Sequence, residues 1–211
     1  SVLGDFIPFD VLKMLAGEDK LNMTLLALNL SKYVNGVAKK HGEISKAMFP
    51  EYSIDSITNG VHSYTWTCDS FRKLYDKYIP GWASDPFSLR YVLSIPKIEI
   101  WAAHSEAKKK LIDYLNSQPN GGFDYGAFTI GFARRAATYK RADLIFSDIN
   151  RLMHISSHIG KIQLVFAGKA HPQDWPGKEL IKRIFLNINQ LKDKIKIIYL
   201  ENYDMELGKM L

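Results

Sequence analysis

The strongest constraint on the fold is an alternation of short apolar runs with longer helix-like segments in the C-terminal part of the sequence. Helical spacing of apolar residues predicts helices at 139–155 and 177–190, and each follows a short run rich in β-branched and aromatic residues. Strands that alternate with helices at this spacing predict βαβ units with right-handed crossovers, and therefore a parallel sheet of the α/β class. The three predicted strands are AFTIGFA (127–133), IQLVFAG (162–168) and KIKIIYL (194–200).

The first 120 residues are mainly helical in character. Apolar spacing between residues 22 and 49 predicts two helices that separate at Asn35-Gly36, because glycine tolerates left-handed backbone angles and ends helices at low cost. Further helices are predicted at 69–78 and 97–116. Clusters of Asn, Gly, Pro and Ser mark loops. The predicted loops are SITNGVHSYTW (56–66) and NSQPNGGFDYG (116–126).

This change of character near residue 120 indicates parts of two domains. We expect residues 1–120 to belong to one and residues 121–211 to the other. Three parallel strands followed by an unfinished helix make only part of a doubly wound sheet. We therefore expect further strands beyond Leu211, and we expect the chain to be a fragment of a longer protein.

Composition and charge narrow the functional class. Hydrophobic residues make up 46% of the chain, which fits a packed globular interior. A single cysteine, Cys68, cannot form an internal disulfide, so we expect a reducing compartment, the cytoplasm by default. No stretch predicts a signal peptide or a membrane span, and we expect no membrane partner. The net charge of +6 favours anionic ligands without choosing among nucleic acid, acidic membrane and phosphate.

A basic cluster lies in GFARRAATYKRADLIF, between the first predicted strand and the helix expected after it. Arg134, Arg135, Lys140 and Arg141 fall within eight positions. Ligands of open parallel sheets bind beyond the carboxyl ends of the strands. The N-terminus of a helix carries partial positive charge, so cations beside it repel that dipole unless an anion lies between them. Arginine forks and a lysine point charge suit phosphate.

Two other interpretations of the cluster remain open at this point. The cations could be solvated side chains at the start of a helix. They could also bind nucleic acid, although no interleaved aromatic platform, helix-turn-helix pattern or RNA-recognition motif accompanies them, so we expect no nucleic-acid partner.

Several motifs together resemble the α-glucan phosphorylases, the glycogen and maltodextrin phosphorylase family. FTIGFARRAATYKRADLIF, QLVFAGKAHPQDWPGKELIKRI and IIYLENYDMELGKML resemble the start of that family's C-terminal domain. NMTLLALNLSKYVNGVAKKHGEISKAMFP and SITNGVHSYTW resemble the end of its N-terminal domain in the shorter bacterial and archaeal members. The resemblance is collinear over residues 20–211. It implies a GT-B architecture of two Rossmann-like domains, with residues 1–120 ending the glucan-binding domain and residues 121–211 beginning the cofactor- and phosphate-binding domain.

The resemblance also implies an activity. It implies phosphorolysis of α-1,4-glucan by inorganic phosphate to give α-glucose 1-phosphate, with pyridoxal phosphate as cofactor and a homodimer as the full-length enzyme. The family's Schiff-base lysine, in a GTSGMK-like segment, has no counterpart in this sequence. We therefore expect this polypeptide alone neither to hold the cofactor covalently nor to catalyse phosphorolysis.

Site residues follow from the family's R-R-x-x-x-Y-K run. Arg135 and Lys140 match positions that hold the substrate phosphate, and Arg134 matches the basic position near the cofactor phosphate. Tyr139 is placed beside sugar and phosphate, with a purely structural role at the helix start as the alternative. Tyr203, in ENYD, matches a tyrosine close to the cofactor. The resemblance implies no metal ligands.

Further residues match less closely or depart from the family. Asn35 is implied to shape a turn at the glucan site, and Lys169, in AGKAHP, to act electrostatically near the ligands. His171 of the same motif is more simply a loop histidine bonded to the backbone. Asp204 stands where the longer enzymes often carry arginine, and Lys32 where they carry a histidine whose backbone contacts glucose.

Two rival functions stay open on the sequence. One is a GT-B glycosyltransferase that uses a nucleotide sugar, as a glycogen synthase does, because it also needs Arg and Lys beside a diphosphate. The other is a non-catalytic module that binds glucan or an anion.

Overall fold

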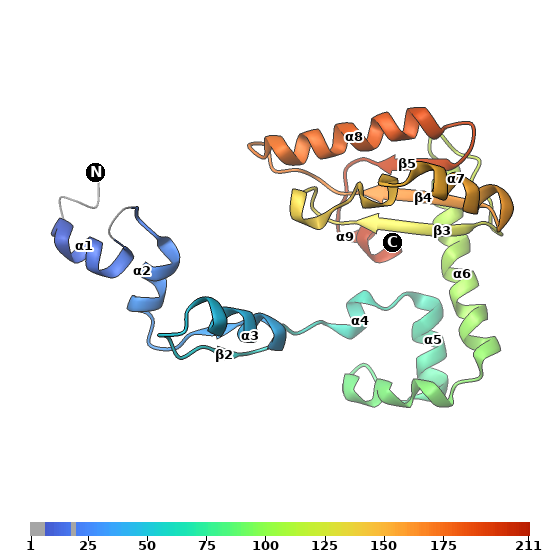
Figure 1. Ribbon diagram of the computed structural model, residues 1–211. Coiled ribbons are helices and arrows are strands. Elements are labelled where there is room, and N and C mark those ends of the chain that lie inside the picture. The colour runs from blue at the N-terminus through green and yellow to red at the C-terminus, as the bar shows by residue number, and fades with distance from the viewer. Residues whose placement is uncertain (1–6, 18–19) are drawn as a thin grey trace. The chain divides into compact units, whose positions relative to one another are not determined.

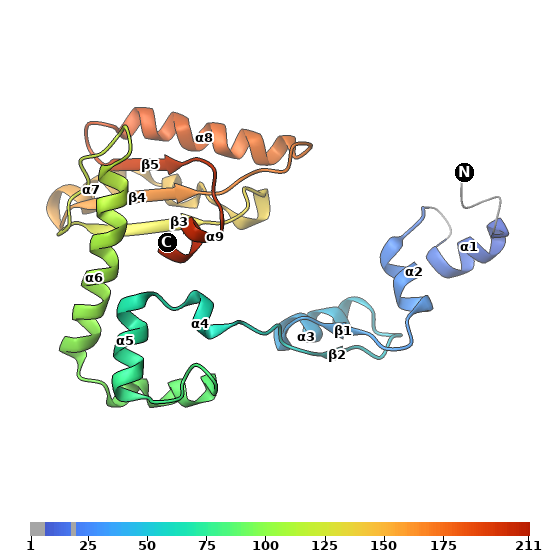
Figure 2. The same cartoon turned by 180° about the vertical axis from the view of Figure 1, so that it is seen from behind.

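The chain folds as a mixed α/β protein with two small parallel sheets. The structure, a computed structural model, describes residues 7–17 and 20–211. It divides into two compact units, Ser1–Val61 and His62–Leu211, shown from two sides in Figures 1 and 2. Within the described residues, no helix has both the length and the apolar character that a membrane span requires.

The first unit combines short helices with a two-stranded parallel sheet. The predicted helix pair is confirmed, and the break at Asn35-Gly36 is itself a short strand. Gly36 is required there, because a Cβ atom would lie 2.6 Å from the backbone nitrogen of Gly42 in the following helix. The elements are α1 (Phe9–Ala16), α2 (Met23–Leu30), β1 (Asn35–Gly36), α3 (Lys39–Met48) and β2 (Asp55–Ser56).

The second unit begins with helices packed around a buried tryptophan. Trp82 is fully buried among Leu74, Ile79 and Ile95, and its Nε1 donates to Asp76 Oδ1 at 2.8 Å. Truncating such a side chain costs about 3–5 kcal/mol. Two of these helices have the predicted bounds, whereas the predicted loop at 56–66 contains a short helix. The elements are α4 (Ser63–Trp66), α5 (Asp69–Tyr78), the 3₁₀ helix η1 (Pro86–Ser94) and α6 (Lys97–Asn116).

An ion pair joins α5 to α6 and makes stability depend on pH. Glu99 accepts hydrogen bonds from Lys77 Nζ at 2.7 Å and from the Tyr78 hydroxyl. The Lys77 ammonium, followed by the Tyr78 hydroxyl, holds the pKa of Glu99 below its ordinary value. A carboxyl with a lowered folded-state pKa stabilises the fold above its unfolded-state pKa, and this contribution is lost as pH falls through the folded-state pKa.

We therefore expect Glu99→Gln to make the free energy of unfolding less dependent on pH below about pH 7. Urea unfolding between about pH 3 and pH 7 measures the effect as a smaller loss of stability on acidification than in the unchanged chain. Glu106→Gln is the matched control on the same helix, because Glu106 reaches Lys110 only at 3.6 Å on an exposed surface. If Glu99→Gln lost as much stability on acidification as the unchanged chain, the role given to Glu99 would be contradicted.

A three-stranded parallel sheet forms the rest of the second unit, in the order β3-β4-β5. Its pairing aligns Ile130 with Leu164 and Val165 with Ile198. Side chains alternate between two cores: α7 and α8 cover one face, and α6 with α9 covers the other. The three predicted strands are confirmed. The elements are β3 (Phe128–Ala133), α7 (Ile149–His158), β4 (Ile162–Ala167), α8 (Trp175–Leu191), β5 (Lys196–Leu200) and α9 (Met205–Met210).

The helix predicted at 139–155 is wrong in its first half. Two 3₁₀ turns, η2 (Thr138–Lys140) and η3 (Leu144–Phe146), precede α7. Arg141, between them, has a left-handed φ of 53°, which an α-helix does not accommodate. Helix α7 starts only at Ile149, where the Asp148 side chain accepts a hydrogen bond from the Arg151 N–H. The argument that the basic cluster flanks the N-terminus of its own α-helix is therefore wrong.

Candidate anion site

The predicted ligand-binding residues of the second unit lie at one edge of the sheet. Strands β3, β4 and β5 run parallel, so their carboxyl ends lie on the same side, as Figure 1 shows. Arg134 follows β3 directly, Lys169 follows β4 and Tyr203 follows β5. This is the edge at which open α/β sheets bind ligands.

Backbone pairing continues past the ends of β3 and β4. The Arg134 N–H donates to the Ala167 carbonyl at 3.2 Å, and the Ala136 N–H donates to the Lys169 carbonyl at 3.0 Å. Both amides thus pair with the end of β4 or the segment that follows it, while the backbone bends at Arg134.

Gly168 permits the close approach of these two segments. Its φ is +147°, and a Cβ atom would lie 2.0 Å from the Arg134 carbonyl oxygen. The Tyr199 hydroxyl donates to the Gly168 carbonyl at 3.0 Å and holds the turn from the far side. Burial raises the pKa of Tyr199, which keeps this hydroxyl protonated as a donor.

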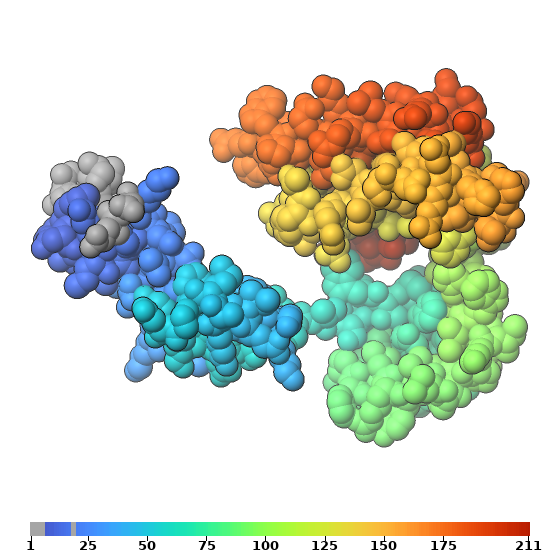
Figure 3. Space-filling model, viewed as in Figure 1, coloured from blue at the N-terminus to red at the C-terminus, as the bar shows by residue number. Residues whose placement is uncertain are grey.

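The first turn of α8 holds the next part of the loop. Gly177, the third residue of α8, packs so closely that a Cβ atom would lie 2.2 Å from the Ala136 carbonyl oxygen. The loop then turns sharply, with Ala137 N–H donating to Arg135 O at 2.8 Å and Lys140 N–H donating to Ala137 O at 2.9 Å. Figure 3 shows this loop beside α8 on one face of the second unit.

The cations of the site carry uncompensated charge. Arg134, Arg135 and Lys169 are exposed, and Lys140 is half-buried. Within the part of the chain that the structure describes, none of the four forms an ion pair with a carboxylate. Lys140 Nζ lies 4.7 Å from the centroid of the exposed Tyr139 ring, a cation–π arrangement. Cations gathered at the carboxyl edge of a parallel sheet are suited to binding an anion.

The loop after β5 has a defined turn and a helix cap. Asn202 has a left-handed φ of 55°, and the Asp204 side chain accepts from the Leu207 N–H at 2.9 Å as the N-cap of α9. Tyr203 is half-buried against the core under α9, and Gly208 leaves room for it, since a Cβ atom there would lie 2.9 Å from the Tyr203 hydroxyl oxygen. Asp204 therefore has a structural use as a helix cap.

His171 has the backbone role that the sequence indicates. Its Nδ1 accepts from the Gln173 N–H at 3.2 Å, in the turn that leads to Asp174. Asp174 caps α8 by accepting from the Gly177 N–H at 2.9 Å. The imidazole thus shapes the entrance to α8.

Asn35, the remaining predicted residue, lies in the first unit. It pairs with Asp55 in the small sheet, and its Nδ2 donates to the Gly36 carbonyl at 3.2 Å. Its role toward a glucan stays a prediction.

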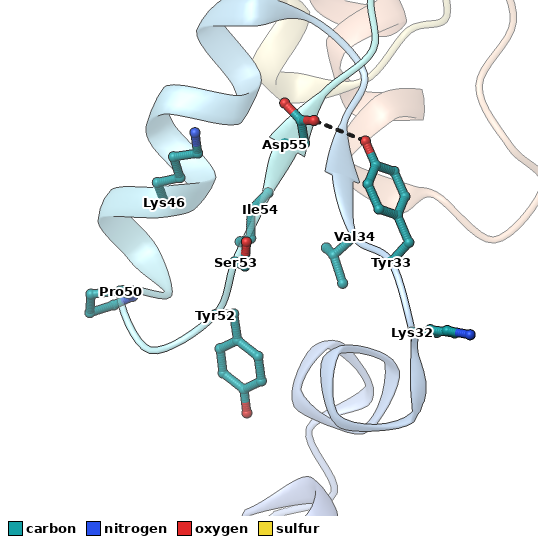
Figure 4. A pocket seen from close by; sticks show the side chains of 9 residues that line it. All are labelled: Lys32, Tyr33, Val34, Lys46, Pro50, Tyr52, Ser53, Ile54 and Asp55. Carbon is teal, nitrogen blue, oxygen red and sulfur yellow. Dashed lines mark hydrogen bonds between the residues drawn. The ribbon is translucent and has the colours of Figure 1, made fainter.

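A polar cavity of about 450 Å³ lies near Asn35 and is drawn in Figure 4. The Tyr33 hydroxyl donates to Asp55 Oδ2 at 3.1 Å across it. The Ser56 N–H, then the Tyr33 hydroxyl, lower the pKa of Asp55. The hydrogen bond to Asp55 raises the pKa of Tyr33. The lining residues are Lys32, Tyr33, Val34, Lys46, Pro50, Tyr52, Ser53, Ile54 and Asp55.

Comparison with known proteins identifies the family. The sequence profile described as Carbohydrate phosphorylase matches residues 8–211. The chain belongs to the carbohydrate phosphorylase family. The resemblance inferred from the sequence motifs is confirmed.

Named members of the phosphorylase family align over most of the chain. The maltodextrin phosphorylase of Thermococcus litoralis is 38% identical, over 89% of this chain and 26% of that protein. The glycogen phosphorylase of Aquifex aeolicus is 37% identical, over 87% of this chain and 30% of that protein. The glycogen phosphorylase of Mycobacterium tuberculosis (strain H37Rv) is 30% identical, over 97% of this chain and 27% of that protein. The chain therefore spans less than a third of the length of these phosphorylases.

Three residues that shape this edge of the sheet were not predicted: Gly168, Gly177 and Tyr199. A glycine directly after a strand indicates close backbone approach, so Gly168 carried a usable signal. Tyr199 lies among apolar residues of β5, and its sequence position does not show which carbonyl its hydroxyl contacts.

Proposed function

We propose that this chain is part of an enzyme that phosphorolyses α-1,4-glucan with inorganic phosphate to give α-glucose 1-phosphate. The observation that carries the proposal is a set of cations at the carboxyl edge of the sheet, none paired with a carboxylate among the described residues, in a chain of the carbohydrate phosphorylase family. The names of the relatives, maltodextrin and glycogen phosphorylase, support the substrate class.

Arg135 and Lys140 hold the substrate phosphate in this proposal. They approach it from the two ends of the turn at Ala137, one with a planar fork and one with a point charge. Two unit charges at 4 Å interact by about 4 kcal/mol in surroundings of intermediate polarity, so fixed cations offset a substantial part of the repulsion between two phosphates. Tyr139 borders the sugar, Lys169 adds positive potential and Asn35 shapes the glucan turn.

The proposal places pyridoxal phosphate at the same edge of the sheet. Arg134 directly follows β3 and Tyr203 follows β5, so both residues lie at the carboxyl ends of the strands. These two residues would hold the cofactor phosphate by charge and hydrogen bonding. The cofactor, when bound, supplies a phosphate that acts as an acid toward the substrate phosphate. A covalent link is not assigned to any lysine of this chain, so the chain alone is proposed to be inactive.

The proposal also covers the domain architecture, the oligomeric state and the location of the enzyme. Residues 121–211 begin the cofactor- and phosphate-binding domain of a GT-B enzyme, and residues 1–120 end its glucan-binding domain and connect the two. A homodimer and a cytoplasmic location belong to the proposal as well.

The deciding experiment is an assay of the whole protein with two alternative pairs of substrates. Maltooligosaccharide plus phosphate is compared with maltooligosaccharide plus UDP-glucose or ADP-glucose. We expect release of glucose 1-phosphate from the first pair and no sugar transfer from the second. Transfer from a nucleotide sugar, as in a glycogen synthase, would overturn the proposal. Binding of glucan or phosphate without either reaction would show a non-catalytic binding module instead.

A further inference from the structure

One carboxylate lies in the loop that carries the cations, residues 134–146. In the stretch Arg134–Phe146 the only acidic residue is Asp143, three positions after Lys140. Arg183, from α8, donates Nε to Asp143 Oδ2 at 3.0 Å, and its Nη2 lies 3.0 Å from the same oxygen. The charge of this carboxylate is thus neutralised by a residue from a different element.

The backbone at Asp143 is anchored on both sides. Its neighbours Ala142 and Phe146 are buried in the core between the sheet and the α7–α8 face. The Asp143 carbonyl accepts from the Phe146 N–H at 3.0 Å, and the side chain of Asp143 is 31% exposed. Without Arg183, a partly buried negative charge would remain fixed a short distance along the chain from Lys140.

We propose that Arg183 shields the anion site from Asp143. The proposal rests on the phosphate-binding role assigned above to Arg135 and Lys140. An unpaired Asp143 carboxylate repels phosphate and competes with it for the Lys140 ammonium. Paired with Arg183, it does neither. Arg183 is a positioning and electrostatic residue that touches no substrate.

A purely structural ion pair between the loop and α8 makes a different prediction. A structural tie needs both groups, so removing either one has the same effect. A shield needs Arg183 only while Asp143 is charged. Asp143→Asn should therefore leave the affinity for phosphate unchanged, and in the double variant it should cancel the loss caused by Arg183→Gln. The two interpretations are therefore separated by a double-mutant cycle on phosphate affinity.

The cycle is measured in the whole phosphorylase at low and at about 0.5 M salt, because a partly exposed charge is screened by ions. We expect Arg183→Gln to raise KM for phosphate about 10-fold at low salt, with less effect at high salt and with KM for glucan unchanged. Asp143→Asn and the double variant should keep KM for phosphate near that of the unchanged enzyme. Arg183→Lys, which keeps the charge, should restore most of the affinity.

Glu179→Gln is the matched control, because Glu179 reaches Lys182 at 3.8 Å in an exposed pair on the same helix. Equal losses in Arg183→Gln, Asp143→Asn and the double variant would overturn the shield in favour of a structural tie. An ordinary KM for phosphate in Arg183→Gln, while Arg135→Ala loses phosphate, would also overturn it and leave the proposed function intact. An ordinary KM for phosphate in Arg135→Ala would remove the proposed site, and the shield with it.

Discussion

Arg135→Ala in the whole phosphorylase is expected to lower kcat/KM for phosphate about 100- to 1000-fold. The side chain is one of the cations that have no carboxylate partner within the described residues, and it lies in the turn between β3 and η2. In the proposed site, its removal leaves the charge of the substrate phosphate without its planar donor. Steady-state kinetics with phosphate varied at saturating maltooligosaccharide measures the loss.

Lys140→Ala is expected to cause a loss of the same order, because in the proposed site its ammonium holds the same phosphate as Arg135. Arg151→Ala is the control: it removes an exposed arginine of α7 that lies outside the site. Its kcat/KM should remain within about twofold of the unchanged enzyme. Ordinary phosphorolysis in both Arg135→Ala and Lys140→Ala would show that the site is assigned to the wrong residues.

Gly168→Ala is expected to destabilise the second unit by about 2–5 kcal/mol. A non-glycine residue is strained by about 1–3 kcal/mol at a φ of +147°, and overpacking against the Arg134 carbonyl adds a comparable cost. The loops after β3 and β4 must separate to admit the methyl group. Urea unfolding of the 211-residue chain, followed by circular dichroism, measures the change in the free energy of unfolding.

Gly160→Ala is the matched control for this prediction. Gly160 follows α7, has no positive φ and would place a Cβ atom in open space. Its substitution should change stability by less than about 1 kcal/mol. If Gly168→Ala is as mild as Gly160→Ala, the close packing of the two strand ends does not contribute to stability.

Much of the fold could be predicted because the relevant signals are local. The bounds of α5 and α6 and the positions of all three strands of the larger sheet follow from apolar periodicity, which reports which side chains must be buried. The helix predicted at 139–155 failed for a non-local reason. Most of its first residues are good helix formers, but the backbone forms two 3₁₀ turns there, with Ala142 and Phe146 buried in one core.

The parallel α/β class, the family and the cluster of cations after β3 can all be inferred from the sequence, because spacing and motif order are local properties of one stretch of chain. The way in which that cluster is held depends on tertiary contacts. Gly168, Gly177 and the Asp143–Arg183 pair act between segments that are distant in sequence. Contacts of this kind depend on where folding brings two backbones together, and a carboxylate among cations acquires its partner only when α8 packs against the loop.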